Sequence, residues 1–217
     1  MSPIALFDLD NTLVDRQGAF HRWAERFVSD WGLPEDAIDA LGDLDNDGFA
    51  SRRVVFDAIR AFYDLPDSSE KLIADYRASY PSYFSPDPEV TEALSTLRSS
   101  GWRTGIVTNG PPSQVDKLRR AGILDLIDGY CISDNIGVAK PDRQIFDEAI
   151  RRCAVPGINP GVVWMMGDTA APDIGGGRNA GLRTIWLHRG RRWEVTEYQP
   201  DLIVGSVREA IEHLLAK

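Results

Sequence analysis

Short apolar runs that alternate with helical stretches dominate the sequence and limit the folds that this chain can adopt. They lie at residues 3–8, 102–107, 129–132, 162–166, 183–187 and 202–204. Helical patterns occur at 89–99, 112–121, 142–153, 173–180 and 206–215. Strands that alternate with helices typically form a parallel sheet with helices on both faces. The sequence therefore predicts an α/β protein with a Rossmann-like parallel sheet core.

Residues 14–84 interrupt this alternation, because their pattern is helical and rich in aromatic residues. Apolar positions spaced three and four apart predict three helices, the first ending at Gly32. These positions are Phe20, Trp23, Phe27 and Trp31, then Val55, Ile59 and Phe62, then Leu72, Ile73, Tyr76 and Tyr80. We expect an α-helical subdomain at 14–84, inserted into a core domain of residues 1–13 and 85–217.

The composition narrows the classes of function. The 217 residues are 43% apolar and 26% charged, as in an ordinary globular protein of one or two domains. The sequence shows neither a long apolar span nor a secretory leader, so we expect a cytoplasmic protein without a membrane partner. The net charge of −9 argues against a nucleic-acid partner. Cys131 and Cys153 are expected to be reduced and packed, and the oligomeric state does not follow from the sequence.

Two aspartates come directly after the first apolar run. Asp8 and Asp10 project from the same side of an extended chain, and Thr12 follows them. Ligands collect beyond the carboxyl ends of parallel strands. Two crowded carboxylates suit a metal-assisted nucleophile with an acid/base beside it, because they repel each other unless a cation or a proton lies between them. A polar turn after a strand is an equally good interpretation of this motif alone.

Two further motifs lie beyond later runs. Thr108-Asn109-Gly110 offers a hydroxyl and backbone N–H groups that can hold an anionic oxygen, although a simple Gly-Pro turn also explains it. Lys140 precedes Pro141, which favours an extended lysine that is aimed rather than mobile. Such an ammonium group would neutralise phosphoryl or carboxylate charge, whereas a lone Lys-Pro is often only a surface turn.

The last motif, Gly167 to Asp173, follows the run at 162–166. Its carboxylates, Asp168 and Asp173, suit metal ligation and support of a ligand from behind. The alternative is a helix N-terminus, where Asp caps and Pro often lies just inside.

Taken in order, these motifs resemble the haloacid dehalogenase superfamily over essentially the whole chain. The segment 14–84 resembles the helical cap that one large group of that superfamily carries after its first strand. Pro172 is a departure, because many relatives have asparagine there, and the run Gly175-Gly176-Gly177 is expected to loosen the following helix.

The resemblance implies a phosphatase that acts on a small phosphorylated metabolite. Asp8 would be the nucleophile that forms an aspartyl-phosphate, and Asp10 the general acid/base, which nearby carboxylates would help to keep protonated. Mg²⁺ would be held by the Asp8 carboxylate, the Asp10 backbone carbonyl and Asp168. The remaining implied roles are phosphoryl binding by Thr108, Asn109, Gly110 and Lys140, and support from behind by Thr12 and Asp173.

Other functions stay open at this point. A phosphomutase of the same fold would transfer the phosphoryl group to a sugar hydroxyl, and a binding or regulatory protein would use the scaffold without catalysis. Dehalogenases of the superfamily lack the second aspartate, so Asp10 argues against that reaction. Phosphonate hydrolysis uses a cap lysine, and Lys71, the one lysine of segment 14–84, lies among polar residues.

Residues Asp43 to Gly48 resemble the start of a calcium-binding EF-hand loop, but the twelfth position is Val54 instead of a bidentate glutamate. A turn between helices is the better interpretation. Arg52, Arg53 or His21 could contact a substrate, and the sequence leaves this open.

Overall fold

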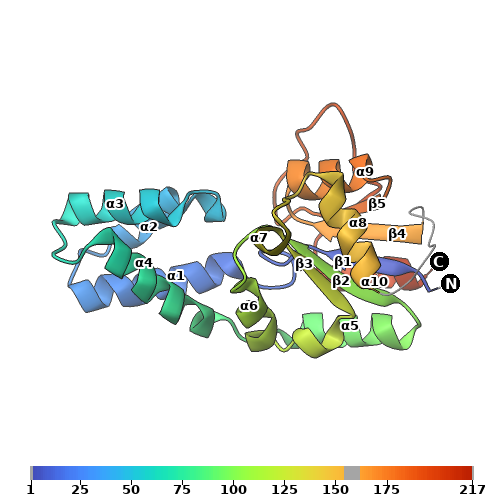
Figure 1. Cartoon of the computed structure of the whole chain (residues 1–217), viewed down its shortest axis with the longest axis horizontal. Helices are drawn as coiled ribbons and strands as arrows, with labels where there is room; N and C mark the ends of the chain where they lie inside the picture. The colour runs from blue at the N-terminus through green and yellow to red at the C-terminus, as the bar shows by residue number, and fades with distance from the viewer. Residues whose placement is uncertain (1, 154–161, 217) are drawn as a thin grey trace. The chain divides into compact units, whose positions relative to one another are not determined.

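Six strands within the described residues, 2–153 and 162–216, form one parallel sheet in the computed structural model (Figure 1). In chain order they are β1 (Ile4–Phe7), β2 (Arg103–Thr108), β3 (Gly129–Ile132), β4 (Val163–Gly167), β5 (Arg183–Leu187) and β6 (Leu202–Val204). Across the sheet the order is β3-β2-β1-β4-β5-β6, and every neighbouring pair is parallel. The α/β core that the alternating runs predicted is confirmed.

Strand β1 lies in the middle of the sheet, between β2 and β4. Its four residues are fully buried, as expected for a parallel strand covered on both faces. The chain runs outward from β1 through β2 to β3, and then returns to the other side of β1 for β4. Open parallel sheets bind ligands beyond the carboxyl ends of the strands at such a switch point. The residues after β1 and β4 therefore lie where a site is expected.

Helices and shorter helical turns connect and flank these strands. They are α5 (Pro88–Ser99), α6 (Gln114–Arg120), η3 (Leu124–Leu126), α7 (Ser133–Ile136), α8 (Arg143–Arg152), η5 (Ala170–Gly175), α9 (Gly176–Asn179) and α10 (Val207–Leu215). The apolar face of α8, with Ile145 and Phe146, packs in one buried cluster with Ile4 and Leu6 of β1. Helices α5 and α10 pack against each other. Within the described residues, no helix combines the length and apolar character needed to cross a membrane.

The chain divides into two compact units, residues 1–14 with 86–217 (the core unit) and residues 15–85 (the helical unit). The helical unit consists of α1 (Arg16–Trp31), α2 (Ala37–Asp45), η1 (Asn46–Gly48), α3 (Arg52–Tyr63), α4 (Ser69–Ser79) and η2 (Tyr80–Tyr83). Its centre is aromatic: the Trp23 ring lies 5.2 Å from that of Phe27 and 4.8 Å from that of Tyr76, between ring centroids. Gly32 ends α1 in the left-handed conformation, which glycine adopts without strain.

Two details of the helical unit differ from the sequence prediction. Helix α2 was not predicted, because its buried face is short and consists mainly of Ala37 and Leu41. Phe62, expected to face the helix core, is 79% exposed. It lies in the last turn of α3. Leu65, which is only 4% exposed, is the buried apolar residue in that region instead.

The glycine run after β4 serves close packing. A Cβ atom on Gly175 would lie 2.8 Å from the Tyr198 hydroxyl oxygen, and one on Gly176 would lie 2.9 Å from the Phe146 ring. The expected helix at 173–180 is a π-helical turn followed by the single-turn helix α9. The regular helix expected at 173–180 is therefore not formed, and the glycines let this irregular segment pack tightly against its neighbours.

Candidate active site

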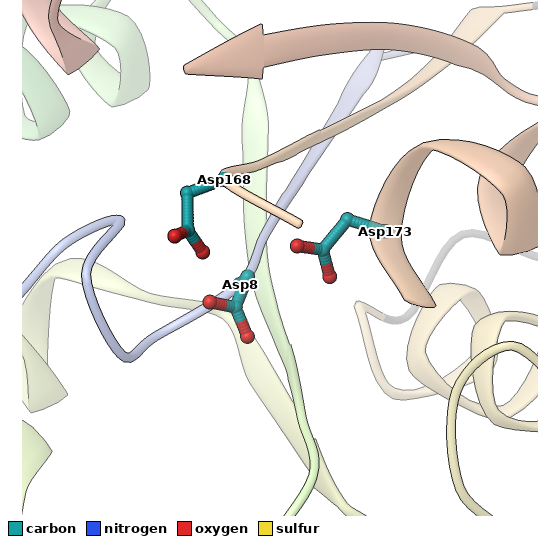
Figure 2. A group of neighbouring side chains, drawn as sticks. All are labelled: Asp8, Asp168 and Asp173. Carbon is teal, nitrogen blue, oxygen red and sulfur yellow. The ribbon is translucent and has the colours of Figure 1, made fainter. Parts of the chain in front are cut away.

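Three acidic side chains meet beyond the carboxyl ends of β1 and β4 (Figure 2). Asp8 directly follows β1, Asp168 directly follows β4, and Asp173 lies in the turn η5. One carboxylate oxygen from each lies within 4.8 Å of the others, and all three side chains are buried. Because β1 and β4 are paired and parallel, the two strand ends deliver their aspartates to the same place.

A buried lysine joins two of these carboxylates. The Lys140 Nζ atom donates to Asp8 Oδ1 at 2.6 Å and to Asp173 Oδ1 at 2.7 Å, and the lysine side chain is 3% exposed. Asn109 fixes the lysine backbone, because its amide accepts from Lys140 N at 2.8 Å and donates to Lys140 O at 3.0 Å. The side chain of Asn109, predicted to bind substrate, thus holds Lys140 in place.

Burial and the neighbouring carboxylates raise the pKa values of two of these aspartates. Burial raises the pKa of Asp8 to about 7; the Lys140 ammonium group opposes this rise, and the carboxylates of Asp173 and Asp168 add to it. Burial also raises the pKa of Asp168, and the Asp173 carboxylate adds to that rise. The pKa of Lys140 is raised although burial acts to lower it, because the carboxylates of Asp173 and Asp8 outweigh burial. Buried carboxylate oxygens are the hard donors that Mg²⁺ prefers, so the three aspartates present fit that metal.

Asp173 is tied down on its other side as well. Its Oδ2 atom accepts from Thr169 N at 2.9 Å and from Thr169 Oγ1 at 2.6 Å, so the carboxylate cannot rotate away from Lys140. Thr12 supports Asp8 in the same manner, since its hydroxyl donates to Asp8 Oδ2 at 3.2 Å. Thr12 therefore contacts Asp8, and Asp173 is held beside Lys140; their supporting role in a metal site stays a prediction.

Two arginines that the sequence analysis missed contact Asp168. Arg189 Nη1 lies 3.3 Å and Arg191 Nη2 lies 3.0 Å from Asp168 Oδ2. The backbone carbonyl of Asp168 also accepts from Trp186 Nε1 at 2.8 Å and from Arg191 at 2.6 Å. The end of β5 and the loop that follows it therefore orient Asp168. A local motif could not reveal this, because the partners lie about twenty residues further along the chain.

Asp10 lies against helix α6. Its carboxylate accepts from Lys117 Nζ at 2.6 Å and 2.7 Å and from Gln114 Nε2 at 2.9 Å. The sequence analysis placed other carboxylates beside Asp10 to keep it protonated, but the structure places an ammonium group there. The same Gln114 nitrogen lies 2.9 Å from the hydroxyl of Thr108, the last residue of β2. Lys117 and Gln114 were not predicted, because polar residues on a helix usually face solvent.

Gly110 takes part differently from the prediction. Its N–H group, expected to bind substrate, donates to the Ser133 hydroxyl of α7 at 2.9 Å. Ser133 is buried and was not singled out from the sequence. This hydrogen bond occupies the Gly110 N–H group in the structure, and the role of Gly110 in binding substrate stays a prediction.

The candidate residues of the helical unit are engaged within that unit. Both oxygens of Asp45 lie near Arg16, at 2.7 Å and 2.6 Å, and Arg52 also binds Asp45, so the aspartate anchors the helices and is not a calcium ligand. Arg53 pairs with Asp57 and Glu70. His21, 59% exposed, lies 3.4 Å from a Glu25 oxygen.

Gly167, the last residue of β4, lies where a larger side chain would collide with Asp173. A Cβ atom there would lie 2.3 Å from the Asp173 Cγ atom. Overpacking of this kind costs about 1–3 kcal/mol. We expect Gly167→Ala to lower the free energy of unfolding by that amount in urea titrations, and to reduce activity by displacing Asp173. Gly42→Ala in α2, where nothing lies within 4 Å of the added atom, is the matched control and should stabilise slightly. Equal stability of the two variants would contradict this prediction.

Three comparisons relate the chain to known proteins. Residues 3–181 match the model of the haloacid dehalogenase-like hydrolase family. Over 208 residues the chain is 32% identical to the phosphoserine phosphatase of Thermus thermophilus, covering 89% of this chain and 78% of the relative. Over 133 residues it is 40% identical to the pyrimidine 5'-nucleotidase YjjG of Escherichia coli, covering 61% of this chain and 57% of the relative. The solved structure of YfnB from Bacillus subtilis, with bound magnesium, superposes over 100% of this chain and 99% of that chain, with a TM-score of 0.80 and 24% identity.

Proposed function

Since the chain belongs to the haloacid dehalogenase-like hydrolase family, we propose that it is a magnesium-dependent phosphomonoesterase acting on a small phosphorylated metabolite. It is a hydrolase of phosphate monoesters, as its relatives named for such reactions indicate. One observation carries the finer proposal: the buried Lys140 ammonium group bridges Asp8 and Asp173, beside Asp168, at the carboxyl end of the central strand.

The first step transfers the phosphoryl group to the protein. A carboxylate oxygen of Asp8 attacks phosphorus, and the bond from phosphorus to the ester oxygen breaks. Asp10 has to take up a proton before this step, because the Lys117 ammonium group beside it favours the carboxylate. It then gives this proton to the leaving oxygen, so the products are an alcohol, an aspartyl-phosphate on Asp8 and a carboxylate on Asp10.

The second step releases phosphate. Asp10, now a carboxylate, takes a proton from a water molecule while the water oxygen attacks phosphorus. The bond between phosphorus and the Asp8 oxygen breaks, and inorganic phosphate leaves. This restores the carboxylate of Asp8 and the proton of Asp10, so the next turnover can begin.

The surrounding residues stabilise charge and hold the reacting groups. Lys140 and the Thr108 hydroxyl would bind phosphoryl oxygens, where fixed donors supply much of the acceleration. Asn109 would act through Lys140, whose backbone it holds. The Asp8 and Asp168 carboxylates and the Asp10 backbone carbonyl would hold Mg²⁺. When bound there, the ion neutralises phosphoryl charge as a Lewis acid.

The substrate class is a small phosphate monoester. Relatives are named for phosphoserine, pyrimidine nucleotides and glyceraldehyde 3-phosphate, so the shared feature is the phosphoryl group and not the alcohol that carries it. We propose that this chain likewise binds the phosphoryl end through the core unit.

Removal of the metal provides the test of this function. We measure inorganic phosphate release from a panel of phosphorylated metabolites, with Mg²⁺ and with a chelator. We expect release with Mg²⁺ to fall at least about 100-fold on chelation and to return with excess Mg²⁺, because the ion contributes several kcal/mol of charge stabilisation. Full activity in chelator would contradict the metal dependence. Conversion of a sugar phosphate without free phosphate would identify a phosphomutase instead.

A further inference from the structure

Helix α6 carries two polar side chains that converge on Asp10, one of them buried and the other largely so. Gln114 is 2% exposed, and the Lys117 side chain is 11% exposed. Residues three apart on a helix share a face, so both reach the Asp10 carboxylate from the same side. Asp10 lies shortly after the end of β1, and its side chain is 24% exposed. Without such partners, a carboxylate in that position could rotate toward solvent.

The contacts fix the orientation of the carboxylate as well as its position. Lys117 Nζ lies 2.6 Å from Oδ1 and 2.7 Å from Oδ2, and Gln114 Nε2 lies 2.9 Å from Oδ2. The Gln114 nitrogen also lies 2.9 Å from Thr108 Oγ1, so one amide links Asp10 to the hydroxyl proposed to bind the phosphoryl group. Donors on both oxygens restrain rotation about the carboxylate bond.

Gly110 makes room for this arrangement. A Cβ atom on Gly110 would lie 3.2 Å from Gln114 Cδ and Nε2, tighter than ordinary packing, and the backbone φ of 146° is one that other residues rarely adopt. Gly110, predicted from the sequence to bind substrate, thus admits the glutamine that orients Asp10. The contacts of Lys117 and Gln114 and the space left by Gly110 therefore all serve to place the Asp10 carboxylate.

On the premise of the proposed function, we propose that Lys117 and Gln114 are positioning residues that aim the Asp10 carboxyl group at the leaving oxygen of the substrate. A general acid acts only within hydrogen-bond reach of the atom that it protonates, and a displacement of about 1 Å can cost on the order of 100-fold in rate. The pair thereby determines how well the enzyme cleaves esters of strongly basic alcohols. Such alcohols need a proton to leave, whereas p-nitrophenolate leaves without one.

The test compares leaving groups. We measure kcat/KM, which reports the steps through alcohol release, for p-nitrophenyl phosphate, phenyl phosphate and β-glycerol phosphate. For Lys117→Met we expect kcat/KM to fall about 100-fold for β-glycerol phosphate and less than about 3-fold for p-nitrophenyl phosphate. Lys117→Arg, which keeps a donor to the carboxylate, should recover part of the loss. Gln114→Met should also lose most on β-glycerol phosphate, on top of a smaller loss common to all three esters, because Gln114 also holds the Thr108 hydroxyl.

Two controls separate positioning from a structural effect. Arg119→Met changes an exposed residue of the same helix that pairs with Asp116, and should leave all three substrates unaffected. In an Asp10→Asn background, Lys117→Met should add little, because residues that act as a unit are not additive.

Specific outcomes overturn the inference. An equal loss on all three esters in Lys117→Met would show a structural role, and a gain on β-glycerol phosphate would show that Lys117 holds Asp10 away from the substrate. In either case the proposed phosphatase would stand. If the unaltered protein released no phosphate from any ester, both proposals would fall.

Discussion

Replacing Asp8 with asparagine is expected to abolish phosphate release, with a loss of at least about 10⁴-fold in kcat. An amide nitrogen or oxygen does not attack phosphorus as a carboxylate does, and no aspartyl-phosphate can form. The variant should remain folded, because asparagine has nearly the shape of aspartate and removes one charge from a buried group of three carboxylates.

The measurement combines turnover with direct detection of the intermediate. Phosphate release is followed with the ester of the panel that is hydrolysed fastest. The mass of the rapidly quenched protein is measured by mass spectrometry. The unaltered protein should carry one phosphoryl group at Asp8 during turnover, and Asp8→Asn should carry none. Asp125→Asn, at an exposed position of η3, is the matched control and should keep full activity. Retained turnover in Asp8→Asn would remove Asp8 from the nucleophile role.

Replacing Lys140 with methionine is expected to impair both activity and folding. The substitution leaves Asp8 and Asp173 without the cation that lies between them, at 2.6 Å and 2.7 Å. Breaking a buried ion pair by removing one partner costs about 3–5 kcal/mol. Losing a donor to the transferring phosphoryl group costs about 10²–10³-fold in kcat. We therefore expect a lower urea midpoint together with a fall in turnover.

Added Mg²⁺ separates the two effects of this substitution. The ion should restore part of the stability of Lys140→Met, because it binds the folded carboxylate group and not the unfolded chain. It should not restore turnover, since the phosphoryl group still lacks its ammonium donor. Lys71→Met, which removes an exposed lysine that pairs with Asp67, should change neither property. Unimpaired turnover in Lys140→Met would exclude Lys140 from the reaction.

The sequence was sufficient to predict those site residues that follow strands. Asp8 and Asp168 come directly after continuous apolar runs, and parallel pairing then brings the strand ends together without further information. The same reasoning located Thr108, which the structure places as the last residue of β2. Hydrophobic periodicity is a local property, so both the sheet and these positions could be predicted from it.

The partners of these residues could not be predicted in this way. Lys117 contacts Asp10 from 107 residues away in the chain, and Arg191 contacts Asp168 from a loop without a regular pattern. A helical lysine near a polar turn resembles any solvated lysine until tertiary packing is known. The internal hydrogen bonds of Gly110 and Asn109 were likewise not predicted, because the sequence pointed only to substrate binding for these residues.

The central place of β1 has a consequence for synthesis on the ribosome. This strand is translated before both of its neighbours in the sheet, which begin at Arg103 and Val163. Until residue 167 has left the exit tunnel, the edge of β1 that pairs with β4 lacks its native partner. Contacts of such long sequence separation form slowly. Nascent chains arrested before β4 should therefore bind chaperones and be readily digested by protease, whereas chains released after it should become resistant.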